Sequence, residues 1–569
     1  MPGAWDAFGP VKADLFRIIS LSLVCLFVVR AVEWPGRFAM NLVKVPAVLP
    51  GLVLIIYGVL AMVFSLLGHG KPLAVLDLLL ALGLFMMLVA ENDRKLVWKM
   101  LAINAGAVGL ASVYGLSQYF GFDWYSWRRG FAGSAPVSTY GNPLFLADGL
   151  ASTLPFAVMG LLSSRRNVRF VSFMLSIVIF AGLLVTQGRG AWAGALIGLA
   201  VLFLFLRPEI LAKKFWVGGW VLGALTIFSL AAFPGTIKSG GEPIFRKALV
   251  LVEQGQGGFR GRFLLWESTA LMARENPIAG AGRGEFSGRY NVFQGPLLAS
   301  PRYAGLEYHS TGHAHQDYLQ MVAESGVVGL GLFFWMVVAV IVTVNRGALY
   351  QAGNSAGLMN SGLLSDQKLK IAALSGVVVY LVDAFFNGPL HLPPSAQWMW
   401  VLVAIACLKV REGASEGGDI LPHRIPVYLV VLVIFASVLV ARPFARDLAG
   451  EVYMKEANQA LENNRPEFAL ERAIDSFALC VEDRRHRFLL GRAYYQLGRF
   501  GDSAEQFGLD AMGNPGMASA WHNLGLSLIQ VGRSGMAVQA FRRAQFLDPT
   551  DKSLPGLISD AEKAVRRTK

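Results

Sequence analysis

The run His313-Ala314-His315-Gln316 lies directly before a long apolar segment, and Ser325-Gly326-Val327-Val328-Gly329 begins nine residues after Gln316. From about residue 316 onward this segment is long enough to cross the ~30 Å hydrocarbon core of a bilayer. Histidine can exchange a proton near neutral pH, and a His-Ala-His-Gln run is uncommon at the end of a membrane span. The stretch therefore predicts a membrane fold and makes His315 a candidate site residue.

The composition of the whole chain supports a membrane protein. Of its 569 residues, 54% are hydrophobic and only 16% are charged, and the mean hydropathy is +0.49. These values are typical of a polytopic membrane protein with appended soluble parts, and they exclude an ordinary soluble enzyme. Cys25, Cys407 and Cys480 are too scattered for a zinc site or a disulfide framework. The net charge of +13 is explained mostly by membrane topology, so we expect no nucleic-acid partner.

Apolar runs long enough to span a bilayer define an all-α, polytopic helical bundle with about twelve spans. They begin near residues 15, 46, 72, 97, 142, 169, 189, 215, 316, 371, 395 and 425. Every second short connection is rich in Arg and Lys, as at 165–169 and 207–214. By the positive-inside rule these connections are cytoplasmic, which places a large loop (about 234–312), the turn at 388–394 and everything after residue 443 outside.

The chain after the last span is polar, and we expect a second domain there. The predicted division is a membrane domain over 1–445 and a repeat domain over 446–569. The spacing of a tetratricopeptide helical pair is matched by Trp521, Leu524, Gly525, Leu528, Ala537, Phe541, Ala544 and Pro549, and 34 residues earlier by Arg487, Leu490, Gly491, Tyr494, Ser503, Phe507, Asp510 and Pro515. Such a domain binds a partner chain on its concave face, or it is a packed spacer without a ligand.

Two of four polar segments at the expected outer boundary contain helix breaks. In Ser138-Thr139-Tyr140-Gly141-Asn142-Pro143, the Gly and Pro leave backbone groups that need partners, which is tolerated only in a protein-lined or wet cavity. Asn142 is thus a cavity-lining candidate, although a plain helix-start turn has the same pattern. In Thr186-Gln187-Gly188-Arg189-Gly190, Arg189 lies between two spans. We favour an anion contact for this guanidinium over an arginine that extends to the interface.

The third polar segment is Gly258-Phe259-Arg260-Gly261-Arg262, in the large outer loop. Arginines flanked by glycine can approach a phosphate closely and hold it with bidentate hydrogen bonds. Arg260 and Arg262 are therefore candidate phosphate ligands. The alternative is that both are solvated loop charges.

The fourth polar segment holds His309, His313 and His315 within seven positions. A metal site lacks a dependable third ligand here, so we expect no metal. The histidines could instead only cap the following helix. We favour a general base or hydrogen-bonding group at a catalytic cavity, with His313 and Gln316 as further cavity-lining candidates. His391, in the proline-rich turn 387–393, serves either the same cavity or the structure of that turn.

Taken together, these segments resemble the O-antigen ligase and polymerase superfamily. The resemblance rests on His315-Gln316 with the following Gly326-x-x-Gly329, on Arg262-x-x-x-Trp266 in a large outer loop, and on Arg189 at a span junction. The turns at Gly141-Asn142-Pro143 and at 387–393 resemble further family landmarks. The likeness covers roughly residues 45 to 410. A tetratricopeptide domain departs from the simplest ligases of this family, and it leaves the acceptor open.

The resemblance implies a membrane glycosyltransferase of the GT-C type in the bacterial inner membrane. Such an enzyme takes a glycan from undecaprenyl pyrophosphate on the periplasmic side, without a cofactor or an essential metal. Arg189, Arg260 and Arg262 would neutralise the departing pyrophosphate. His315 would accept the proton of an attacking hydroxyl and give an inverted product.

The acceptor is lipid A core for a ligase, a growing glycan for a polymerase, or Ser/Thr of a protein for an O-oligosaccharyltransferase. We place the ligase first on the histidine motif, while the repeats favour a protein acceptor or partner. A non-catalytic component of polysaccharide export or assembly is the alternative of another class, and it predicts that His315 is dispensable. A flippase is less attractive because the membrane halves show no internal repeat.

Overall fold

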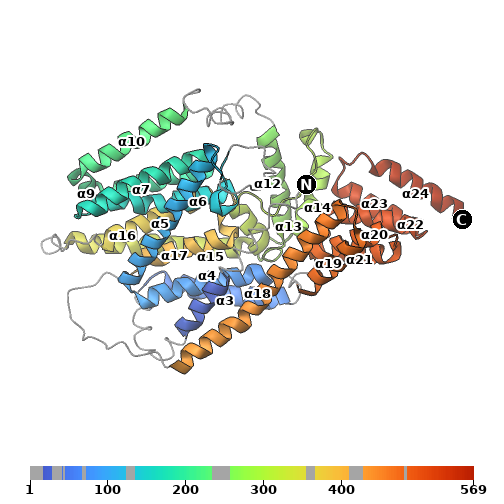
Figure 1. The fold of residues 1–569 in the computed structure, drawn as a ribbon, viewed down its shortest axis with the longest axis horizontal. Coiled ribbons are helices and arrows are strands. Elements are labelled where there is room, and N and C mark those ends of the chain that lie inside the picture. The colour runs from blue at the N-terminus through green and yellow to red at the C-terminus, as the bar shows by residue number, and fades with distance from the viewer. Residues whose placement is uncertain are drawn as a thin grey trace.

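The structure, a computed structural model, describes residues 17–28, 42, 45–66, 72–123, 135–232, 257–353, 366–408, 427–479 and 484–568. Within these ranges every regular element is a helix, so the predicted all-α class is confirmed. In Figure 1 the apolar helices lie together on one side and the C-terminal helices on the other, with α12, α13 and α14 between them.

A helix lies at each of the twelve predicted span positions. The first covers 17–28 and the last is α18, Val427–Glu462. The ten between them are α3 (Val48–Leu66), α4 (Pro72–Glu91), α5 (Arg94–Tyr119), α6 (Pro143–Met159), α7 (Arg166–Val185), α8 (Arg189–Phe205), α10 (Lys214–Ala232), α15 (Asp317–Gly353), α16 (Asp366–Asp383) and α17 (Pro393–Ala406).

Five of the described helices are long and apolar enough to cross a membrane, which makes the chain a multi-pass membrane protein. They cover Leu73–Glu91, Arg94–Tyr119, Pro143–Leu162, Arg166–Val185 and Asp317–Asn345. Four shorter apolar helices accompany them, at Arg17–Val28, Val48–Ala61, Arg189–Phe205 and Lys214–Leu230. Among the described residues, five full spans are thus shown, and the twelve predicted spans are not.

Helix α16 lies at the centre of the bundle, packed against both α8 and α6. Its contact with α8 is close because α8 presents glycines one turn apart. A Cβ added at Gly194 would lie 2.7 Å from the Val379 carbonyl oxygen, and one at Gly198 would lie 2.8 Å from that of Ser375. Small residues of this kind let membrane helices approach backbone to backbone. The contact brings the start of α8, with Arg189, beside the end of α16, with Asp383.

Helix α15 is broken at Gly326, which has φ 64° and ψ −175°. The break is pinned by the segment 277–282, because Val327 N donates to Pro277 O at 2.8 Å and Gly282 N donates to Glu324 O at 3.0 Å. Only glycine adopts this backbone conformation readily, and a Cβ here would also lie 1.9 Å from Ile278 O. The first turns of α15, which follow His315, therefore form a separate helical piece.

The predicted outer loop over about 234–312 is largely helical where it is described. It contains α12 (Gly257–Glu275), α13 (Phe286–Arg289), α14 (Asn291–Leu298) and the short 3₁₀ helix η3 (Pro301–Tyr303). Residues 233–256 of this loop lie outside the described residues. Arg260 and Arg262 therefore lie on a helix, α12, within the segment that the sequence suggested to be a loop.

The chain ends in a run of paired helices. After α18 come α19 (Pro466–Leu479), α20 (Arg484–Gln496), α21 (Phe500–Gly513), α22 (Ala518–Gln530), α23 (Ser534–Leu547) and α24 (Leu554–Thr568), each packed on the next. A Cβ at Gly491 would lie 2.9 Å from the Phe507 ring, and one at Gly525 would lie 2.4 Å from the Phe541 ring. The same glycine–phenylalanine contact thus recurs after 34 residues.

The predicted domain boundary at 445/446 falls inside α18, which runs unbroken from Val427 to Glu462. Composition changes at this point because the helix leaves an apolar stretch for a polar one, while its backbone continues. The first part of α18 is thus continuous with the helix that packs on α19.

Candidate functional site

His315 lies in the turn before α15, with a left-handed backbone at φ 50°. The turn is held on both sides: Trp266 Nε1 of α12 donates to Ala314 O at 3.2 Å, and Ala314 N donates to the side-chain oxygen of Gln320 at 2.9 Å. A left-handed non-glycine residue is uncommon and costs about 1–3 kcal/mol, so it persists only where the surroundings fix it. The imidazole of His315 is half-buried.

The electrostatic surroundings keep His315 uncharged. Burial lowers the pKa of His315, and the nearby Arg262 guanidinium and His309 lower it further. A histidine whose pKa lies below its ordinary value is neutral at pH 7 and has a free ring nitrogen that can accept a proton. The structure thus gives His315 the protonation state that a general base requires.

Of the three predicted arginines, Arg262 lies near His315, and Arg189 lies near Arg262. Arg262 of α12 donates from Nη1 to Phe386 O at 3.2 Å, and burial together with the nearby Arg189 lowers the pKa of Arg262, partly offset by Asp383. Arg189, at the start of α8, is exposed. Two guanidinium groups held close to each other repel, and an anion between them relieves that repulsion.

The third predicted arginine is directed elsewhere. Arg260 Nη2 donates to Arg302 O at 2.7 Å and to Ala304 O at 3.2 Å. Residues two apart on a helix do not face the same way, so the helical form of α12 separates Arg260 from Arg262. The described hydrogen bonds of the Arg260 guanidinium therefore go to the backbone at the end of η3.

A carboxylate that sequence reasoning did not assign to the site lies beside the arginines. Asp383 Oδ1 accepts a hydrogen bond from Asn387 Nδ2 at 2.7 Å, and a Cβ added at Gly190 would lie 2.1 Å from the same oxygen. Gly190 therefore makes room for this carboxylate at the start of α8. The sequence signal was present, because Asp383 and Asn387 lie one turn apart at the end of a span, but only the fold places them beside Arg262.

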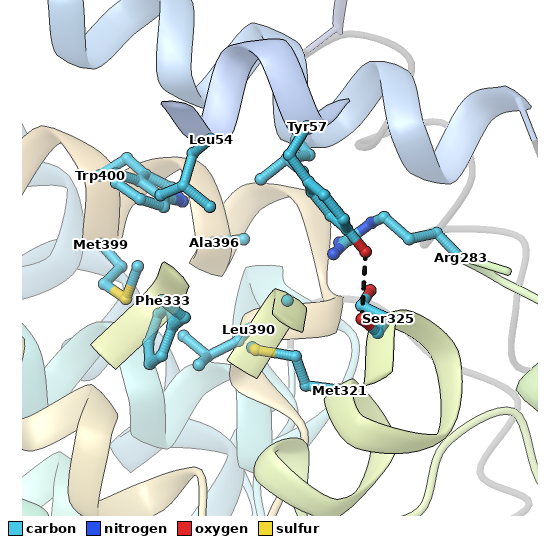
Figure 2. Close-up of a pocket in the computed structure, with 12 residues that line it drawn as sticks. Leu54, Tyr57, Arg283, Met321, Ser325, Phe333, Leu390, Ala396, Met399 and Trp400 are labelled. Carbon is cyan, nitrogen blue, oxygen red and sulfur yellow. Dashed lines mark hydrogen bonds between the residues drawn. The ribbon is translucent and has the colours of Figure 1, made fainter. Parts of the chain in front are cut away.

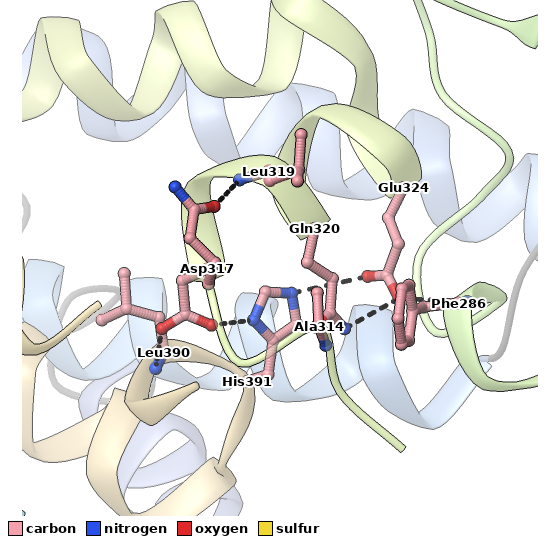
Figure 3. Close-up of polar contacts among 9 residues, drawn as sticks. Phe286, Ala314, Asp317, Leu319, Gln320, Glu324, Leu390 and His391 are labelled. Atoms are coloured by element: carbon pink, nitrogen blue, oxygen red, sulfur yellow. Dashed lines mark hydrogen bonds and ion pairs between the residues drawn. The ribbon is translucent and has the colours of Figure 1, made fainter. Parts of the chain in front are cut away.

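His391 lies between two carboxylates, with 10% of its side chain exposed (Figure 3). One ring nitrogen pairs with Asp317, and the other lies 3.6 Å from Glu324 Oε2. Burial alone would lower the pKa of His391, but Asp317 and Glu324 raise it to about 9. Because both nitrogens are engaged, His391 is held as a cation and is not a free base.

The carboxylates around His391 also bind the backbone of neighbouring segments. Asp317 Oδ2 accepts from Leu390 N at 2.8 Å, and Glu324 Oε1 accepts from Phe286 N at 3.3 Å. The three side chains of Asp317, Glu324 and His391, here termed the ion cluster, thus join the start of α15 to the 388–391 turn and to α13 (Figure 3). The cluster fixes the helix that follows His315.

The remaining predicted residues mostly organise helix starts. The side-chain oxygen of Asn142 accepts from Leu144 N at 2.8 Å and caps α6, and that of Gln316 accepts from Leu319 N in the first turn of α15. Capping of this kind satisfies the free N–H groups of a helix start. The His313 ring lies 6.1 Å from the His391 ring. Among the described residues, no group of three or more His, Cys, Asp or Glu side chains could hold a metal ion.

An apolar pocket adjoins the ion cluster on the side of α3 and α17 (Figure 2). Its lining includes Leu54, Phe333, Met399 and Trp400, and Leu390 from the 388–391 turn. Polar groups gather at one end, where the Tyr57 hydroxyl donates to Ser325 O at 3.2 Å beside the side chain of Arg283. The ion cluster is therefore bordered by apolar side chains on the side that faces α3 and α17.

Comparison with known families matches residues 171–334 to a model described as O-antigen ligase. Residues 171–334 are therefore similar to the O-antigen ligase family. The matched segment contains Arg189, Arg262 and His315, the three groups that the fold brings together, and it ends after the break at Gly326. No curated protein matches the chain.

Proposed function

We propose that the O-antigen ligase domain transfers a glycan from undecaprenyl pyrophosphate to an acceptor hydroxyl, with His315 as the general base. One observation carries the proposal: a histidine with a lowered pKa lies beside Arg262, which in turn lies beside Arg189. A neutral base next to two cations suits a reaction that takes a proton from one substrate while a diphosphate leaves the other.

The proposed step is a single displacement. His315 accepts the hydroxyl proton as the acceptor oxygen bonds to the anomeric carbon, and the bond from that carbon to the pyrophosphate oxygen breaks with its electron pair. Arg262 and Arg189 stabilise the negative charge that develops on the leaving group. Attack from the face opposite the leaving group inverts the anomeric centre. No metal or cofactor has a role in this scheme.

The outer placement of the site follows from the positive-inside rule. We propose about twelve spans in a GT-C-like bundle in the bacterial inner membrane, with α12–α14, the His315 turn and the C-terminal helices on the periplasmic side. A lipid-linked donor fits this position because its glycan and pyrophosphate would be at the aqueous boundary while its polyprenyl tail remained among the apolar helices.

Lipid A core is the acceptor that we place first, with a growing glycan or a secreted protein as the alternatives. The recurring glycine–phenylalanine contacts after 34 residues support a tetratricopeptide domain over about 446–569. A concave surface of such repeats would favour a protein acceptor or an assembly partner. The acceptor therefore has to be determined by direct comparison.

The test is transfer from purified undecaprenyl-pyrophosphate glycan in detergent with EDTA, offering lipid A core, free glycan and a Ser/Thr-rich secreted protein separately. Product with the wild type, and none with His315→Ala, supports a metal-independent transferase and names its acceptor. Normal glycan assembly in cells that carry only His315→Ala would sink catalysis at His315 and favour the non-catalytic export or assembly component.

A further inference from the structure

The C-terminal helices contact the outer segment of the membrane domain directly. Gly516 N, in the turn before α22, donates to Gly288 O at 3.1 Å. Helix α14 packs on α23, and Figure 1 shows the two side by side. Gly295 of α14 permits this approach, because a Cβ there would lie 2.0 Å from Phe546 O and 2.9 Å from Leu547 O.

Tyr308 is bound by both sides of this contact. Its hydroxyl donates to Gly516 O at 3.3 Å and accepts from Asn291 Nδ2 at 3.0 Å, and its backbone N donates to Thr550 Oγ1 at 3.3 Å. Burial raises the pKa of Tyr308 to about 12, so the phenol keeps its proton and remains a donor at neutral pH. One side chain and its own amide thus reach two separate points of the C-terminal domain.

The segment after Tyr308 leads to the base by a short series of hydrogen bonds. The Tyr290 hydroxyl donates to His309 O and accepts from Thr311 N, both at 2.6 Å. The Thr311 hydroxyl then donates to His313 O at 3.2 Å. Only Ala314 separates His313 from His315, so displacement of Tyr308 would be transmitted along an ordered backbone.

We propose that Tyr308 is a positioning residue for the transfer step, through which the C-terminal helices hold the segment 308–313 and set the orientation of His315. The inference rests on the proposed function of His315. It gives the C-terminal domain a direct part in the reaction, so a partner chain that binds these helices would change the rate of transfer and not only the location of the enzyme.

The first test compares one substitution at two places. Gly295→Ala inserts a methyl group against the Phe546 carbonyl, whereas Gly535→Ala, in α23, meets open space. We expect Gly295→Ala to lower kcat about tenfold or more while KM for the lipid donor stays unchanged, since small misplacements of a catalytic group are costly. Gly535→Ala should match the wild type. Amide exchange over 308–313 should rise only in Gly295→Ala.

The second test removes single hydroxyls. Tyr308→Phe should lower kcat and raise exchange over 308–313. Tyr303→Phe, in the same outer segment, loses a bond to Glu267 of α12 and should leave exchange over 308–313 unchanged. Wild-type kcat in Tyr308→Phe and Gly295→Ala despite raised exchange overturns the inference, and so does unchanged exchange in both. Amide exchange is measured without substrate, so it tests the contact between Tyr308 and the C-terminal helices even if the wild type shows no transfer. Absence of transfer by the wild type would contradict the proposed function and not this contact.

Discussion

Two histidines near the start of α15 meet opposite surroundings. His315 lies beside Arg262, and its pKa is lowered, whereas His391 lies between Asp317 and Glu324, and its pKa is raised to about 9. One is therefore neutral and the other charged at the same pH. The difference shows that neighbouring charges can give two histidines of one region opposite protonation states: an arginine lies near His315, whereas two carboxylates flank His391.

The largest expected effect is loss of transfer on removing the neutral histidine. His315→Ala should lower kcat by about 10²- to 10⁴-fold, the usual contribution of a general base, with normal membrane insertion. His309→Ala, in the same segment but exposed, is the matched control. The measurement is the initial rate of glycan transfer in detergent. Equal losses in the two variants would contradict a specific role of His315 as the general base.

Removal of the charged histidine should affect stability more than chemistry. A folded-state pKa of about 9 for His391, above the unfolded value of about 6.5, stabilises the protein fully below pH 6.5 and progressively less as the pH rises through 9. The maximum contribution is on the order of 3 kcal/mol.

Thermal unfolding of His391→Gln against the wild type in detergent tests this assignment. The difference in Tm should be large at pH 6 and should shrink toward pH 10. A difference that is constant across this range would mean that His391 stabilises the fold by packing and not by its charge.

The two arginines of α12 should differ in their effect on kcat. Arg262→Gln should lower kcat about 100-fold, because it removes a cation beside the leaving group. Arg260→Gln should leave kcat within a few-fold, since that guanidinium binds the carbonyls of Arg302 and Ala304. Rates at saturating donor provide the comparison. Equal losses would show that both arginines face the donor during the reaction.

The smallest effect is a shift in the pH profile. If neutral His315 is required, kcat/KM should fall toward acid with a limb below pH 6.5. Arg262 contributes to the lowered pKa of His315, so Arg262→Gln should move that limb to higher pH. An acid limb at the same pH in Arg262→Gln and in the wild type would mean that Arg262 does not influence the pKa of His315. The measurement requires only the residual activity of the variant across pH 5 to 8.

Much of the fold was accessible from the sequence because apolar length determines where membrane helices form. The helix starts, the cap at Asn142 and the 34-residue period follow from local pattern alone. The number of full spans stays a prediction, because only five of the described helices are long and apolar enough to cross a membrane. The helical form of α12 was also missed: Gly258 and Gly261 suggested a loop, but packing of α12 against α14 and α15 outweighs the low helix propensity of glycine.

The candidate site was only partly predictable, because some of its residues come together only through tertiary packing. His315 and Arg189 could be singled out because such groups are uncommon at the ends of membrane spans. Arg262 was singled out together with Arg260, because flanking glycines let an arginine approach a phosphate closely. Asp383 was not assigned, since it reaches the arginines through tertiary packing of α16, and for His391 the sequence left open a cavity role or a structural role in its turn. Tyr308 carried no sequence signal at all: its partners Gly516 and Thr550 are more than 200 positions away.

The break in α15 has a consequence for how the length of this helix can vary. In an unbroken α-helix each inserted residue turns everything beyond it by about 100°, so lengthening the membrane part would rotate the turn that carries His315. At Gly326 the helical phase is reset, because Pro277 and Ile278 hold the backbone there. Residues after 326 can therefore be added or lost to fit a thicker or thinner bilayer, while the orientation of His315 stays the same.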